Sequence, residues 1–300
     1  MLLGYEKAPV GNSSFGSLFP RGVPVEPDFP EPACSERRKF RTIWISDIHL
    51  GTKGCNAELL IDFLDSTDSE IMYLVGDIID GWRLKKRPYW PASHNDIVWR
   101  ILKRAKRGTR IIYIPGNHDE MMRQFSGMNF GGVEIAGAAY HDTADGRRLL
   151  VLHGDEFDTI MLAHRWLAVV GDALYHLLMG ANRWVNVART WLGLPYWSLS
   201  KVAKHKVKNA VEFISAYEEV VARAAAERGV DGVVCGHIHT AEIRDLGGVT
   251  YYNDGDWVEG CTALVEHFDG RMELLHWPEE IERRRLEAAA PAYLQQARAA

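Results

Sequence analysis

Residues 41–49 have the sequence RTIWISDIH, a short apolar stretch that ends in two potential metal ligands, Asp47 and His49. β-Branched and aromatic residues dominate positions 41–45, so a strand is expected there. Side chains two positions apart in an extended segment point the same way, so Asp47 and His49 can present two ligands from one strand end. The pair places a candidate metal site at the end of this first strand.

Four later stretches end in a similar way. Strands are expected at 71–75, 110–114, 148–152 and 232–235, with helical stretches between them, as in βα units around a layered sheet. The residues that follow them are Gly76-Asp77 with Asp80, Gly116-Asn117-His118-Asp119, His153-Gly154-Asp155, and Gly236-His237-Ile238-His239. Open α/β sheets place ligand crevices at the carboxyl ends of their strands. Five successive strands that deliver Asp, His or Asn there predict one polar site.

The donor types in this set favour divalent metal ions. Carboxylate, imidazole and amide oxygen suit Mn²⁺, Fe²⁺ or Zn²⁺, whereas softer metals favour thiolates. The cysteines form no C-x-x-C pair and are expected to be buried or idle thiols. One carboxylate can bridge two metals about 3.5 to 4 Å apart, an arrangement that activates water for phosphoryl displacement. A single D-x-H or Gly-Asp would be ordinary turn chemistry, but five such segments in order predict a two-metal site.

This ordered set resembles the calcineurin-like metallophosphoesterase superfamily, whose pattern is D-x-H, G-D-x-x-D, G-N-H-D/E, a later H, and G-H-x-H. The resemblance covers about residues 41–277 and implies an α/β fold, a four-layer α/β/β/α sandwich with a helical cap insertion. It implies two divalent ions, Mn²⁺ in the first place, with Fe²⁺ or Zn²⁺ as alternatives. The implied ligands are Asp47, His49 and His239 for one ion, Asn117, His153 and His237 for the other, and Asp77 as the bridge.

The same resemblance implies catalytic roles for the residues beside these ligands. His118 would face the substrate, together with Asn117, and would stabilise the transition state or protonate the leaving oxygen. Asp119 would orient His118. Asp80 would support a ligand-bearing turn without binding a metal itself.

Within the superfamily, the chain resembles the group that includes the UDP-2,3-diacylglucosamine pyrophosphohydrolases of lipid A synthesis. The shared features are the segments at 44–47, 152–155 and 252–257 and a helical insertion between His153 and Gly236. They imply hydrolysis of UDP-2,3-diacylglucosamine to UMP and 2,3-diacylglucosamine 1-phosphate. The best-known enzymes of this group carry Arg where this chain has His118, so a phosphodiesterase or phosphatase of other lipid or nucleotide substrates is the alternative. A non-enzymatic scaffold is disfavoured because every ligand position is filled.

The chain is expected to have three parts. Residues 1–38 are rich in Gly, Ser and Pro and are expected to form a flexible leader. Residues 39–277 would form the metallophosphoesterase domain, with the cap inserted at about 159–228. Strands expected at 250–253, 261–268 and 272–276 suggest a second, more antiparallel sheet. Residues 278–300 are expected to form a C-terminal helix and tail.

The expected cap is rich in Trp and Leu, which would suit acyl chains and a membrane surface, although helical spacing of apolar residues equally suits packing against the domain. Lys204 and Lys208 are predicted substrate contacts, with a solvated helix face as the alternative. The same two interpretations apply to the basic residues at 83–87.

Composition limits the class of partner. The 300 residues carry a formal charge of -5, which argues against a sequence-independent nucleic-acid binder. No secretion signal is recognised, and no apolar run approaches the roughly 18 to 20 residues of a membrane span. A cytoplasmic protein is expected, with a peripheral contact to the cytoplasmic face of the inner membrane and a nucleotide-linked glycolipid as its phosphate-ester substrate.

Overall fold

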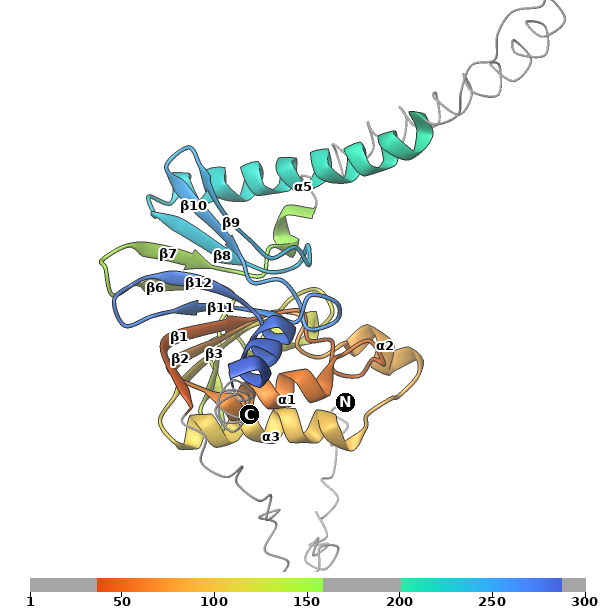
Figure 1. Ribbon diagram of the computed structural model, residues 1–300, viewed down its shortest axis with the longest axis vertical. Coiled ribbons are helices and arrows are strands. Elements are labelled where there is room, and N and C mark those ends of the chain that lie inside the picture. The colour runs from red at the N-terminus through yellow and green to blue at the C-terminus, as the bar shows by residue number, and fades with distance from the viewer. Residues whose placement is uncertain (1–36, 159–200, 288–300) are drawn as a thin grey trace, which may run out of the picture. The chain divides into compact units, whose positions relative to one another are not determined.

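The computed structural model describes residues 37–158 and 201–287, whose strands form two sheets (Figure 1). The first sheet has seven strands in the order β12-β11-β1-β2-β3-β5-β4. Their bounds are β1 Arg38–Ile45, β2 Thr67–Val75, β3 Arg110–Ile114, β4 Asn129–Phe130, β5 Val133–Ile135, β11 Thr262–Glu266 and β12 Met272–His276. Strands β1, β2, β3 and β5 run parallel to one another, whereas β11 and β4 pair antiparallel with β1 and β5 at the two sides, and β12 pairs antiparallel with β11.

The second sheet has five strands in the order β6-β7-β8-β10-β9. Their bounds are β6 Ala139–Asp142, β7 Arg148–Val151, β8 Gly232–Cys235, β9 Glu242–Leu246 and β10 Val249–Asn253. The central strands β7, β8 and β10 pair in parallel, and β6 and β9 close the sheet antiparallel at its two edges. Strand β8 is buried along its whole length, as expected for a parallel strand covered on both faces.

Three apolar clusters define how the layers pack. Helices α1 (Ala57–Ser66) and α3 (Ala92–Lys106) pack on the first sheet through Phe63 and Ile97. Helix α5 (Lys201–Glu227) packs on the second sheet through Tyr217 and Val221. The third cluster joins residues of both sheets, among them Trp44, Tyr73, Ile112, Leu149 and Val234. The order helices, sheet, sheet, helix is compatible with the four-layer sandwich implied by the sequence (Figure 1).

Each expected strand is observed, but the second sheet was the wrong place for two of the last three, and β4, β5, β6 and β9 were not expected. The ranges 110–114, 232–235 and 272–276 coincide with β3, β8 and β12, and β1 and β2 begin a few residues earlier than expected. Strands β11 and β12 extend the first sheet, because β11 pairs with β1 in the register Thr42↔Glu266. Strand β10 pairs in parallel with β8, in the second sheet. Alternation along a strand predicts which side chains are buried but does not identify the neighbouring strand.

The predicted insertion and tail lie partly outside the described residues. Residues 159–200 are not described, and α5 begins at Lys201. Because Tyr217, Val221 and Ala225 pack on the second sheet, the last turns of α5 belong to the domain core, which differs from the expectation that the cap continues to residue 228. Residues 277–287 are helical. Within the described ranges, no helix has the length and apolar character needed to cross a bilayer.

Candidate metal centre

The turns after the strands hold the predicted ligands in an uncommon backbone conformation. Non-glycine residues with positive φ include Asp47 at 49°, His49 at 53°, Asp77 at 53°, His237 at 70° and His239 at 54°. A left-handed conformation of this kind costs on the order of 1–3 kcal/mol and persists only where the surrounding structure enforces it. Backbone hydrogen bonds enforce it here, since the Asp47 amide donates to Gly76 and the His49 amide donates to Asp77.

The first group of candidate ligands combines strand ends from both sheets. Asp47, His49 and His239 each offer a ligand atom, and these atoms lie within 4.8 Å of one another. The Nε2 atom of His239 is 3.1 Å from Oδ1 of Asp47, and the Nε2 atom of His49 is 3.8 Å from the same oxygen. His49 Nε2 is also 3.9 Å from Oδ2 of Asp77. This group can hold one metal ion.

The second group shares Asp47 with the first and adds Asp77 and His153. The three ligand atoms again lie within 4.8 Å of one another, and His153 Nε2 is 3.6 Å from Asp77 Oδ2. The Asp77 carboxylate therefore lies between histidines of both groups, which is the position that a bridging ligand requires. The Oδ1 atom of Asn117 is buried and has no hydrogen-bond partner.

Two glycines allow this close approach. A Cβ atom on Gly116 would lie 2.3 Å from Asp77 Oδ1, and one on Gly76 would lie 2.2 Å from His153 Nδ1. No side chain larger than hydrogen fits at either position unless the ligands move. The glycines of the Gly-Asp and Gly-Asn-His segments are therefore steric requirements of the site.

Unpaired polar atoms show that the residues fit divalent ions. The buried atoms without a hydrogen-bond partner include Asp47 Oδ1, His49 Nε2, Asn117 Oδ1 and His153 Nε2. Each such atom costs about 1–3 kcal/mol when it is left unsatisfied in a protein interior. Metal coordination would satisfy these oxygen and nitrogen atoms together, and the donor set is the one that Mn²⁺, Fe²⁺ and Zn²⁺ accept.

The ionisation of the second group follows from its burial and its charges. Burial disfavours a charged imidazole, but the nearby carboxylates of Asp77 and Asp47 outweigh it and raise the pKa of His153 to about 10. Burial would likewise raise the pKa of Asp77, yet the contact with His153 lowers it. His153 Nδ1 donates to the carbonyl of Val75 at 2.8 Å, which directs Nε2 toward Asp77.

The buried Asp119 carboxylate organises the turn after β2. It accepts hydrogen bonds from the amides of Ile78 at 2.8 Å and Gly116 at 2.6 Å, and from the hydroxyl of Tyr113. The amides of Asp77 and Ile79 donate to it at 3.3 Å. Among the described contacts, none joins this carboxylate to the His118 ring, so the expected orienting contact is absent from the described part of the chain.

Asp80, rather than Asp119, is the carboxylate that lies beside the His118 ring. Its Oδ1 atom is 3.1 Å from Nδ1 of His118, and its Oδ2 atom is 3.5 Å from Nδ1 of His49. Its side chain also accepts from the amide of Arg83 at 2.8 Å and caps the short helix α2 (Gly81–Lys86). The Trp82 ring packs on the His118 ring, with centroids 4.3 Å apart. The His118 imidazole is therefore held between a carboxylate and an indole.

The His237 ring lies at the metal centre and contacts the Asp158 carboxylate. Its Nε2 atom is 2.8 Å from Oδ1 of Asp158, and its amide donates to Asp47 Oδ2 at 2.9 Å. Its ring packs edge-on against the ring of His153, with centroids 5.2 Å apart. As a metal ligand, His237 would have to use Nδ1 or give up the contact with Asp158.

Two residues behind Asp47 were not predicted from the sequence. The Ser46 hydroxyl lies 2.7 Å from Asp47 Oδ2 and 2.6 Å from Asp254 Oδ1. Asp254 is fully buried, and burial raises its pKa. The sequence feature that could have indicated them is the Asn-Asp-Gly-Asp segment at 253–256, which has two aspartates where a turn needs at most one. The predicted substrate contacts Lys204 and Lys208 fall in α5, but their side chains lie outside the described part of the structure.

Comparison with known proteins identifies the class to which this fold and site belong. Residues 40–241 match the family model of the calcineurin-like phosphoesterases. The chain belongs to this family and is a metal-dependent phosphoester hydrolase.

Several relatives share a more specific name. A UDP-2,3-diacylglucosamine hydrolase of Nitrosococcus oceani is 25% identical over 238 residues, which cover 74% of this chain and 90% of the relative. One of Neisseria meningitidis serogroup C is 26% identical over 229 residues, which cover 74% and 92%. Among solved structures, a phosphopantetheinyl hydrolase of Mycobacterium tuberculosis aligns over 73% of this chain and 90% of its own, with 14% identity and a TM-score of 0.36.

Proposed function

We propose that the protein hydrolyses the diphosphate of UDP-2,3-diacylglucosamine and releases UMP and 2,3-diacylglucosamine 1-phosphate. The observation that carries the hydrolytic part is the convergence of Asp47, Asp77 and His153 with unpaired ligand atoms. The substrate is supported by relatives of that name, which align over about nine tenths of their length. The proposed cofactors are two divalent ions, with Mn²⁺ as the first choice, held by the two ligand groups together with Asn117 and His237.

The residues of the chain perform distinct tasks in this reaction. When bound, the two divalent ions would lower the pKa of water and polarise the phosphoryl oxygens. Asp77 keeps the two ligand groups together, and His118 donates a hydrogen bond or a proton to the leaving sugar-phosphate oxygen. Asp80 lies against the opposite ring nitrogen of His118, so it can fix the direction of that donation. Water adds to the α-phosphorus, and the bond from that phosphorus to the bridging oxygen breaks.

Basic side chains and the inserted segment would hold the substrate. Lys204 and Lys208 would contact the diphosphate, and the insertion that begins at about residue 159 would cover the acyl chains with the part that precedes the core-packed end of α5. The reaction would take place at the cytoplasmic face of the inner membrane, where a lipid-linked substrate resides. A phosphodiesterase or phosphatase acting on other lipid or nucleotide esters is the alternative, because His118 occupies a position at which the best-known enzymes of this group carry Arg.

Product analysis in labelled water tests the proposal. Purified protein is loaded with Mn²⁺ and incubated with UDP-2,3-diacylglucosamine in mixed micelles in ¹⁸O-water. The expected result is UMP that carries one ¹⁸O atom, with an unlabelled sugar phosphate. The control substrate is bis(p-nitrophenyl) phosphate, which requires only the metal centre. Turnover of this control without release of UMP would reject the substrate but keep the hydrolase, and undiminished turnover after removal of metal by a chelator would reject both.

A further inference from the structure

The chain after Asp80 presents an unusual set of exposed side chains. We call this set the α2 surface, and its members are Trp82, Arg83, Lys85, Lys86, Arg87, Tyr89 and Trp90. The aromatic members are large and accessible: Trp82 is 43% exposed, Tyr89 36% and Trp90 38%. The sequence contains no Asp or Glu between Asp80 and Asp96. Such a concentration of exposed aromatic rings and cations on a protein surface indicates a docking site.

Among the residues that the structure describes, no acidic side chain pairs with the cations of the α2 surface. None of Arg83, Lys85, Lys86 and Arg87 forms an ion pair with another described residue, whereas other surface arginines, such as Arg123 with Asp155, are paired. The whole chain carries a formal charge of -5, so a cluster of four cations is opposite in sign to the net charge of the protein. Unpaired cations that gather at one place attract an anionic partner.

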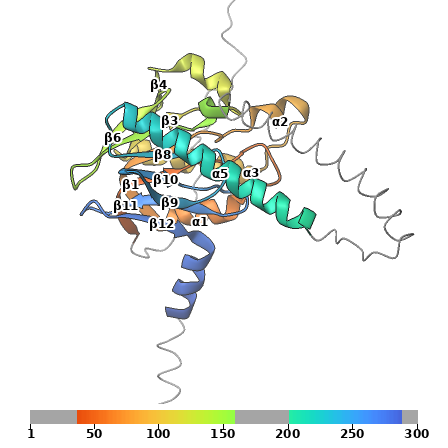
Figure 2. The same ribbon diagram turned by 90° about the horizontal axis from the view of Figure 1, so that it is seen from above.

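The α2 surface adjoins the metal centre. The amide of Gly81 donates to the carbonyl of His118 at 3.0 Å, and the Trp82 ring packs on the His118 imidazole. Helix α2 lies at the periphery of the fold in both views (Figures 1 and 2). Whatever binds the α2 surface is therefore held beside the residue proposed to protonate the leaving group.

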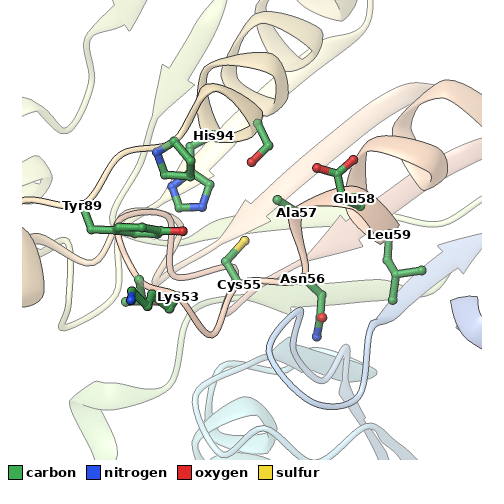
Figure 3. A pocket seen from close by; sticks show the side chains of 11 residues that line it. Lys53, Cys55, Asn56, Ala57, Glu58, Leu59, Tyr89 and His94 are labelled. Atoms are coloured by element: carbon green, nitrogen blue, oxygen red, sulfur yellow. The ribbon is translucent and has the colours of Figure 1, made fainter.

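A small cavity continues this surface. It has a volume of about 250 Å³ and is lined by Lys53, Asn56, Tyr89 and Ser93, among others (Figure 3). Lys53 is exposed, and its Nζ atom lies 5.9 Å from the centre of the Tyr89 ring. The cavity therefore adds a fifth cation next to the aromatic part of the α2 surface.

We propose that the α2 surface docks the protein on a bilayer of anionic phospholipids. Trp and Tyr rings prefer the headgroup level of a membrane, and Lys and Arg beside them are attracted to anionic lipids. The reason for docking rests on the proposed function, since a diacylated substrate is embedded in a bilayer and its diphosphate lies at the surface. A single-stranded nucleic acid is the competing partner, because bases also stack on aromatic rings. The membrane is favoured because the exposed rings and cations belong to one short segment of a chain with a formal charge of -5, whereas a nucleic-acid site tracks a backbone along a basic groove.

Vesicle sedimentation of the full chain tests the docking. The protein is mixed with vesicles of phosphatidylcholine alone or with added phosphatidylglycerol. We expect binding to the anionic vesicles, weak binding to the neutral ones, and a decrease as salt is raised. The triple variant Lys85→Gln, Lys86→Gln, Arg87→Gln should bind the anionic vesicles about 100-fold more weakly, since each cation near such a surface contributes roughly fivefold. The matched control is Lys39→Gln, Lys106→Gln, Arg223→Gln, which removes the same charge from exposed positions elsewhere.

The outcomes separate docking from catalysis. We call the triple variant at positions 85–87 the α2 variant. The proposal is supported if the α2 variant loses vesicle binding, the control variant keeps it, and both hydrolyse bis(p-nitrophenyl) phosphate at the wild-type rate. It is overturned if the α2 variant binds like the wild type, if neutral vesicles bind equally well, or if a single-stranded oligonucleotide binds more tightly than the anionic vesicles. Docking without release of UMP would instead reject the proposed substrate, because the vesicle assay requires no turnover.

Discussion

The Nδ1 atom of His118 lies 3.1 Å from Oδ1 of Asp80, and the same carboxylate caps helix α2. Both contacts fix the position of Asp80, whose side chain is almost fully buried. Asp119, the immediate neighbour of His118 in sequence, instead turns its carboxylate toward the amides of Ile78 and Gly116. The two acids of this region therefore have separate tasks: one adjoins the reactive imidazole and the other holds the turn that carries Asp77.

The first prediction concerns Asp80. Asp80→Asn should lower kcat by about 10- to 100-fold and change KM little, because outer partners of site histidines typically have effects of that size. At saturating Mn²⁺ the variant should retain its metal, which elemental analysis measures. Asp269→Asn, on an exposed turn, is the matched control and should behave as the wild type. Wild-type turnover in Asp80→Asn would remove Asp80 from the orientation of His118.

The second prediction concerns Asp119, whose carboxylate is buried and accepts several amide hydrogen bonds. Asp119→Asn would place an NH₂ group against these N–H donors and leave some of them unsatisfied. We expect a loss of about 2–4 kcal/mol in the free energy of unfolding, together with weaker metal binding. Urea denaturation of the metal-loaded protein measures the first effect. Tyr113→Phe removes only one donor to this carboxylate and should cost about 1 kcal/mol; an equal cost for both variants would contradict the organising role of Asp119.

Much of the site could be predicted from sequence because each ligand follows a strand. The expected ends of β1, β2, β3, β7 and β8 lie within one residue of the observed ends, so their turns were located correctly. Contacts between distant segments could not be predicted in this way. The contact of His118 with Asp80 depends on the relative position of the turns that follow β3 and β2. Neither the apolar periodicity nor the spacing of the motifs predicts that position. The placement of β11 beside β1 was missed for the same reason, because it joins segments more than 200 residues apart, whose contacts include those of the buried Glu266 with Arg41 and Thr42.

The third prediction concerns Asp77, which lies between the two ligand groups. Asp77→Ala should abolish turnover and lower the metal content, because the second group loses a ligand and the first loses the carboxylate that lies beside His49. His118→Ala should also abolish turnover but retain the metal, because it removes a proton donor and none of the predicted ligands. Measuring bound metal beside turnover for the two variants distinguishes these effects. Full activity in either variant would contradict the assignment.

The fourth prediction concerns Glu266, a buried carboxylate that joins the two sheets. It lies on β11 of the first sheet and is 2.9 Å from Nε2 of His141 on β6 of the second. It also accepts from Arg41 at 2.7 Å and from the amide of Ala144 at 2.7 Å. Burial would raise the pKa of Glu266, but the hydrogen bonds from His141, Ala144, Thr42 and Arg41 outweigh it and lower the pKa to about 2.

The direction of the pH effect follows from that lowered pKa. A carboxyl group with a folded-state pKa below its unfolded value of about 4.5 stabilises the folded protein fully above that pH, and the contribution is lost as the pH falls toward 2. We therefore expect the free energy of unfolding to decrease over this acidic range. Glu266→Gln should be less stable at pH 7 by about 3 kcal/mol, because it leaves the buried partners of the carboxylate unpaired, and should show a smaller decrease on acidification. Urea denaturation at several pH values measures both effects, with exposed Glu58→Gln as the control. If Glu266→Gln and the wild type lost stability in parallel over the acidic range, the lowered pKa of Glu266 would not be the cause of that loss.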